Sequence, residues 1–62
     1  LPELSRREKE VLAYLSQGLS TSEISQLLFL SINTIQTYRK RLMEKLEAKN
    51  VAELVYKGKS LF

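Results

Sequence analysis

At 62 residues the chain is long enough for one small domain, and its formal net charge of +3 is concentrated in residues 33–49, where five basic side chains stand against two acidic ones. It contains neither cysteine nor histidine, which excludes a disulfide framework and removes the usual thiolate and imidazole ligands, so we expect neither a metal nor another cofactor. The longest apolar run, residues 27–30, is far shorter than the about 20 residues of a membrane-spanning helix, so we expect a cytoplasmic domain without membrane contact.

The first predicted helix covers residues 6–17. Ser5 stands at its N-cap position and Glu8 follows three residues later, which is the pattern of a capping box. Its apolar residues recur at helical spacing: Val11, Leu12 and Leu15. Gly18 then offers a residue that can end the helix in the left-handed conformation.

A second helix is predicted over about residues 21–28, after the N-cap Ser20 with Glu23 in the same capping pattern. We expect it to bury three apolar side chains: Ile24, Leu27 and Leu28. Its first amides are a candidate phosphate site, which makes Thr21 and Ser22 candidate contacts with a nucleic-acid backbone. Only three residues separate this helix from the next, and so short a connection predicts the steep crossing of a helix-turn-helix.

The third helix is predicted over about residues 32–47, after the N-cap Ser31. A helical projection gives it a buried stripe with two marginal members: Ile35, Leu42 and Leu46, with Ile32 and Met43 at the edge. Tyr38 and Arg39 border this stripe. We expect Tyr38 to pack, with a hydroxyl that could reach a DNA backbone. We expect Arg39 to pack its stem while its head group meets a glutamate or a phosphate, with the ion pair favoured.

The opposite face of this helix is polar and basic. It presents Asn33, Gln36, Thr37, Lys40, Arg41 and Glu44. Lysine or arginine can bond guanine in the major groove of DNA, glutamine or asparagine can bond adenine, and threonine can contact thymine. An ordinary solvated helix face has a similar pattern, so the concentrated charge and the short turn are what favour DNA recognition by residues 33–41. Lys49, at the end of the basic segment, is a further candidate backbone contact.

The fourth helix is predicted over about residues 51–57, between the N-cap Asn50, with Glu53 in the capping pattern, and a terminating Gly58. No segment alternates with period two. The predicted fold class is therefore all-α, a four-helix helix-turn-helix domain without a wing, formed by residues 1–62 as a single domain. Its expected core comprises Leu4, Val11, Leu12, Leu15, Leu19, Ile24, Leu28, Leu30, Ile35, Leu42, Leu46 and Leu54.

Four separated motifs resemble the LuxR/FixJ/GerE type of DNA-binding domain: residues 4–12 (LSRREKEVL), 18–25 (GLSTSEIS), 28–38 (LFLSINTIQTY) and 45–46 (KL). The resemblance covers nearly the whole chain. It implies a four-helix domain that binds double-stranded promoter DNA as the output module of a bacterial transcription regulator, with a two-component response regulator as the favoured context. The fragment is then the C-terminal part of a longer regulator, and RNA polymerase is a candidate partner.

The resemblance also implies residue roles. Gln36, Thr37 and Lys40 correspond to base readers, and Thr34 and Lys45 to backbone contacts. In such domains the fourth helix is the usual dimer contact, which here implies a homodimer interface formed by Val51, Leu54, Val55 and Tyr56. Because so short a helix cannot bury all four side chains internally, we expect Tyr56 or Val55 to be exposed in the monomer.

Four positions depart from the common pattern of the family. Ser25 stands where alanine is common, Tyr38 where histidine is common, and Arg39 where an aliphatic residue is frequent. Gln36 replaces a frequent lysine, which removes a cation and indicates an altered base preference.

Two other functions fit the sequence less well. Region 4 of a sigma factor is similar in helix order and also places a helix in promoter DNA. A helical protein-interaction module that has lost DNA binding would keep the same core. An enzyme is not expected, because no nucleophile is paired with a base.

Overall fold

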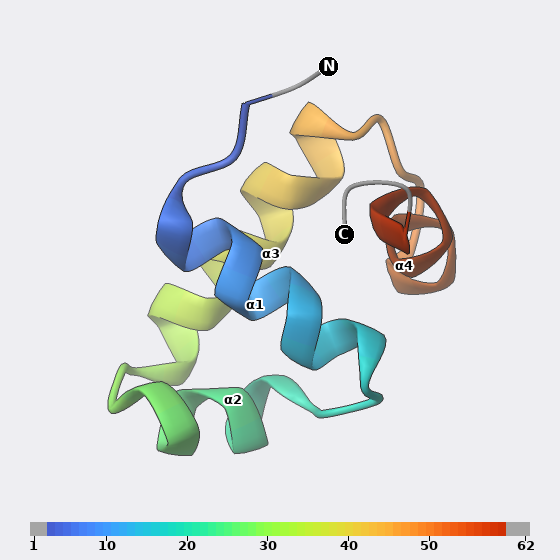
Figure 1. Cartoon of the computed structure of the whole chain (residues 1–62). Coiled ribbons are helices and arrows are strands. Elements are labelled where there is room, and N and C mark those ends of the chain that lie inside the picture. Colours follow the sequence, from blue (N-terminus) through green and yellow to red (C-terminus); the bar gives the residue numbers. More distant parts are fainter. Residues whose placement is uncertain (1–2, 60–62) are drawn as a thin grey trace.

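A computed structural model of the chain describes residues 3–59, which form four α-helices and no strand. The helices are α1 (Arg6–Ser16), α2 (Thr21–Leu28), α3 (Ile32–Lys45) and α4 (Val51–Gly58). In Figure 1, α1 lies across α3, α2 lies below both, and α4 stands to one side. The predicted all-α fold with a helix-turn-helix formed by α2 and α3 is confirmed.

Each helix begins directly after the capping residue that the sequence predicted. The hydroxyls of Ser5 and Ser20 each accept a hydrogen bond from the amide of a glutamate three residues later, and each glutamate bonds back to its cap. Ser31 caps α3 without such a glutamate. Asn50 caps α4, but the expected reciprocal bond is replaced, because the Glu53 carboxylate pairs with Lys57 at 3.2 Å.

Three of the four helices end with the same device. Gly18, Phe29 and Glu47 take left-handed backbone conformations with φ of 87°, 55° and 54°. In each case the next residue donates its amide to the carbonyl five positions back, at 3.2, 3.0 and 2.9 Å, respectively. This hydrogen bond satisfies a carbonyl that the last turn of a helix leaves free. Because α3 ends in this way at Lys45, it is two residues shorter than predicted.

Gly58 was expected to terminate α4 in a left-handed conformation, and this prediction is wrong. It is the last residue of the helix and is buried. A Cβ at this position would lie 2.9 Å from both δ-carbons of Leu12. The missing side chain thus allows α4 to approach α1 closely.

The core draws at least one fully buried side chain from every helix. Val11, Ile24, Ile35, Leu42 and Leu54 are all completely buried. Nine of the twelve predicted core residues are buried, and the other three pack against them half-buried: Leu19, Leu28 and Leu30.

Helix α2 departs from its predicted burial. Leu27 was expected inside the core, but 52% of its surface is exposed, and the buried companion of Ile24 is Ser25. The Ser25 hydroxyl donates to the Ser22 carbonyl at 2.7 Å, which satisfies its polar group inside the fold.

Candidate nucleic-acid interface

The five side chains expected to read DNA bases lie on one exposed face of α3. Asn33, Gln36, Thr37, Lys40 and Arg41 are all exposed, and their positions along the helix recur at three- and four-residue spacing. The opposite face carries Ile35 and Leu42, both fully buried. The core therefore fixes the rotation of α3, and this rotation directs the polar face outward.

The cations on this face are not neutralised by neighbouring carboxylates. Within residues 3–59 neither Lys40 nor Arg41 forms an ion pair, and the same holds for Lys49 beyond the end of α3. Arg39 is half-buried, but the ion pair with a glutamate that we expected for it is not formed among these residues. The positive charge of α3 is thus available to a polyanion.

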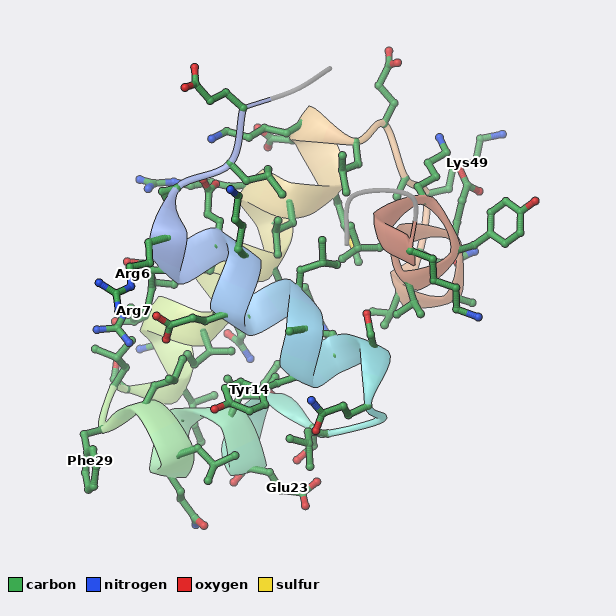
Figure 2. All side chains as sticks on the ribbon, in the orientation of Figure 1. Arg6, Arg7, Tyr14, Glu23, Phe29 and Lys49 are labelled. Carbon is green, nitrogen blue, oxygen red and sulfur yellow. The ribbon has the colours of Figure 1, made fainter. Side chains whose placement is uncertain are left out.

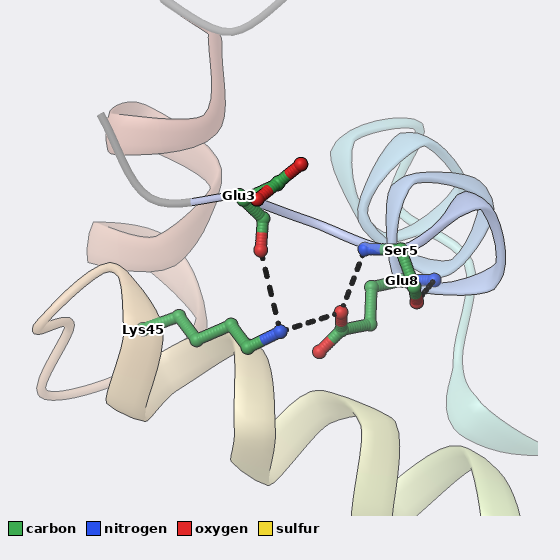
Figure 3. A network of polar contacts seen from close by, with 4 residues as sticks. All are labelled: Glu3, Ser5, Glu8 and Lys45. Atoms are coloured by element: carbon green, nitrogen blue, oxygen red, sulfur yellow. Dashed lines mark hydrogen bonds and ion pairs between the residues drawn. The ribbon is translucent and has the colours of Figure 1, made fainter.

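Lys45 has a different environment from the one predicted. Its ammonium donates to Glu8 Oε1 at 2.8 Å and to the Glu3 carbonyl at 3.4 Å (Figure 3). Glu8 is only 3% exposed, and its Oε1 also accepts a bond from the Ser5 amide at 2.8 Å. The lysine expected to contact the DNA backbone is thus also the cation that pairs with a buried carboxylate.

Burial and hydrogen bonding shift the pKa of Glu8 in opposite directions. Burial alone raises the pKa, but the hydrogen bonds from Lys45 and Ser5 outweigh it and hold the pKa below its ordinary value. Glu8 is therefore ionised in the folded domain at neutral pH. The sequence identified it only as a capping residue, because nothing in a separation of 37 residues signals the contact with Lys45.

The expected backbone contacts differ in how accessible they are. Ser22 is exposed and Thr21 half-buried in the first turn of α2, where the amides lack intrahelical acceptors. Thr34 is half-buried in the first turn of α3. Tyr38 is half-buried and packs against the core, as expected. Lys49 is exposed near the start of α4 (Figure 2).

The residues expected at a dimer interface do not form one exposed set. Leu54 is fully buried in the core of the monomer, so assigning its side chain to a dimer surface was wrong. Tyr56 is 77% exposed, in agreement with the expectation for an unpaired chain, and Val51 and Val55 are half-buried.

The sequence did not predict the exposed aromatic at the turn between α2 and α3. Phe29 is 94% exposed and points away from the body of the domain (Figure 2). Its backbone is left-handed, and no glycine or asparagine marks this position in the sequence.

Comparison with known proteins decides the family. The model of bacterial regulatory proteins of the luxR family matches residues 2–57. This chain belongs to that family. The LuxR-type domain is a helix-turn-helix that binds DNA in bacterial transcription regulators, so the resemblance to the family is confirmed and the alternative of sigma region 4 is set aside.

Several curated proteins are similar to this LuxR-type domain. The virulence-factor positive transcription regulator BvgA of Bordetella pertussis is 46% identical over 52 residues, which cover 84% of this chain and 25% of BvgA. The DNA-binding transcriptional activator EvgA of Escherichia coli is 41% identical over 54 residues, covering 87% of this chain and 26% of EvgA. A protein of Pseudomonas aeruginosa named as a transcriptional regulator is 47% identical over 55 residues, covering 89% of the chain and 27% of that protein.

The chain thus spans about a quarter of the length of these relatives. No solved structure matches it significantly. Among the residues that the structure describes, no helix is long and apolar enough to cross a membrane, and no group of acidic side chains is arranged to hold a metal ion. As a DNA-binding module of transcription regulators, the domain is not an enzyme.

Proposed function

We propose that this LuxR-type domain recognises specific promoter sequences by placing the N-terminal half of α3 in the major groove. The supporting observation is the outward polar face described above, backed by the fully buried Ile35 and Leu42. Helices of this kind read base edges with side chains from their first turns. The proposed base readers are Asn33, Gln36, Thr37, Lys40 and Arg41.

The DNA backbone is contacted by groups on either side of this helix. Thr21 and Ser22 offer free amides at the positive end of α2, where a phosphate is favoured by the helix dipole. Lys49 supplies an exposed cation without an ion pair. Thr34 and Tyr38 are the further proposed contacts on α3. Lys45 remains a proposed contact as well, because its side chain is 41% exposed although its ammonium pairs with Glu8.

In the cell we assign the domain to the cytoplasm, as the output module of a two-component response regulator. The named relatives are a positive transcription regulator and a transcriptional activator, which favours activation and contact with RNA polymerase. Because three quarters of each relative lies outside the matched region, there is room for a receiver domain in proteins of this kind.

A homodimer formed through α4 would place two recognition helices on an inverted pair of half-sites. The exposed Tyr56 is the centre of the proposed interface, with Val51 and Val55 beside it. Covering a largely exposed aromatic ring with a partner chain removes apolar surface from water and so stabilises the dimer.

The experiment that tests this function is selection of preferred duplexes from a random pool, followed by measurement of affinity and its salt dependence. Lys40→Ala should lose about 1–3 kcal/mol of binding free energy, mainly on the preferred duplex. Lys49→Ala should weaken binding to all duplexes and reduce the slope of log K against log salt by about one unit.

Lys9 provides the matched control, since it is exposed and free of ion pairs but lies on α1. Lys9→Ala should leave affinity and salt slope unchanged. Equal losses for Lys9, Lys40 and Lys49 on preferred and random DNA would contradict the proposed interface.

A further inference from the structure

Two threonines lie in the N-terminal half of α3, and both of their hydroxyls are engaged inside the protein. Thr34 Oγ1 shares a hydrogen bond with Ser31 Oγ at 2.8 Å, next to the cap bond from the Thr34 amide to the same serine. Thr37 Oγ1 donates to the Asn33 carbonyl at 3.0 Å, one turn earlier in the helix. Thr37 therefore presents no free hydroxyl proton to a ligand, whereas in the Ser31–Thr34 pair either hydroxyl can be the donor.

This bond fixes what Thr37 offers at the exposed face. Threonine is branched at Cβ and has few χ1 rotamers in a helix, one of which bonds the carbonyl four residues back. With Oγ1 turned back toward Asn33, the γ-methyl occupies a different staggered position, away from that carbonyl. Since Thr37 is exposed, its methyl is the apolar group among otherwise polar proposed readers.

We propose that Thr37 reads the 5-methyl group of a pyrimidine, thymine or 5-methylcytosine, in the major groove. The 5-methyl is the apolar feature of the base edges there, whereas the other features are hydrogen-bond donors and acceptors. The four remaining readers carry amide, ammonium or guanidinium groups suited to those donors and acceptors. This inference depends on the proposed function, because it names the chemical feature that one residue of that interface recognises.

The predicted size of the effect follows from removing one methyl group from water. A buried methyl or methylene group is worth about 0.8 kcal/mol, which corresponds to roughly a three- to fivefold change in affinity. The contact thus tunes preference at one base pair without determining whether the domain binds.

The test replaces each thymine of the selected duplex, one at a time, by deoxyuridine, which lacks the 5-methyl group and keeps every hydrogen-bonding group. For the wild-type domain, one position per half-site should lose about three- to fivefold in affinity. Thr37→Val should keep this loss, and Thr37→Ser, which lacks the γ-methyl, should abolish it. Lys9→Ala, on α1 outside the proposed interface, should leave it intact.

A second comparison isolates the methyl from the rest of the base. With a cytosine–guanine pair at the sensitive position, 5-methylation of the cytosine should restore about three- to fivefold in affinity for the wild type and not for Thr37→Ser. Circular dichroism of each variant verifies that the helices are intact.

The outcomes separate this inference from the function on which it depends. If the wild-type domain binds a selected duplex but no thymine is sensitive to deoxyuridine, or if Thr37→Ser keeps the sensitivity, the reading of a 5-methyl group by Thr37 is wrong while DNA binding stands. If no duplex is preferred over random DNA, the proposed function itself fails.

Discussion

Replacing Lys45 by methionine removes the cation from a buried carboxylate and tests whether this lysine serves the fold. Met is one atom shorter than Lys45 but keeps most of its apolar stem, so packing changes little. Glu8 would remain 3% exposed, with Oε1 bonded to the Ser5 amide and with Oε2 already lacking a hydrogen-bond partner. Removing one partner of a buried ion pair lowers the free energy of unfolding by about 3–5 kcal/mol when water cannot reach the remaining charge.

The expected loss is smaller than this limit, because the Lys45 side chain is 41% exposed and water can reach the position it leaves. We expect Lys45→Met to lower the free energy of unfolding by about 2–3 kcal/mol. For a domain of this size, that loss lowers the melting temperature by roughly 10–20 °C. Thermal and urea unfolding followed by circular dichroism measure both quantities.

Two further variants sharpen the measurement. Glu8→Gln removes the buried charge, so Lys45→Met should cost much less in that background than in the wild type. Lys49→Met is the matched control on an exposed lysine without an ion pair and should change stability by less than about 0.5 kcal/mol. If Lys45→Met is as harmless to stability as Lys49→Met and instead weakens DNA binding, Lys45 is a phosphate contact and the structural role is refuted.

Three other predictions follow from features of the fold. The pKa of Glu8 is held below its ordinary value of 4.5, so the stability that the ionised carboxylate contributes should be complete above about that pH. It should be lost as the pH falls through the lower pKa of the folded state. An acid titration of Glu8→Gln should lack this pH-dependent loss of stability. Phe29→Gly and Glu47→Gly should each raise the free energy of unfolding by about 0.5–1 kcal/mol, because both positions are left-handed and exposed; urea unfolding would contradict the turn geometry if either variant were destabilised. Tyr56→Ala should leave folding intact and weaken self-association on DNA, measured by gel shift and light scattering, and an unchanged dimer would remove Tyr56 from the interface.

Signals that act over a few residues allowed the helices to be predicted from the sequence. Ser5, Ser20, Ser31 and Asn50 all cap helices in the structure, since capping depends only on a side chain and an amide three residues away. The periodic apolar residues likewise indicated which face of α3 is buried and hence which face meets solvent.

Features that depend on packing between distant segments escaped prediction. Glu47, just beyond the end of α3, and Phe29, after α2, are not glycines, so only the assembled fold shows their left-handed backbone. Gly58 was predicted to end a helix. In the structure it lies where a side chain would collide with Leu12 of another helix. The ion pair between Lys45 and Glu8 was not predicted, because the two residues are 37 positions apart in the sequence.

The brevity of the helices has a consequence for how the domain melts. Helices α2 and α4 have eight residues each, too few to persist in water on their own, and every helix contributes to the same apolar cluster. We therefore expect unfolding to be an all-or-none event. Helix α3 should therefore unfold together with the helices packed against it. Heating should abolish affinity for DNA and helical content at the same temperature.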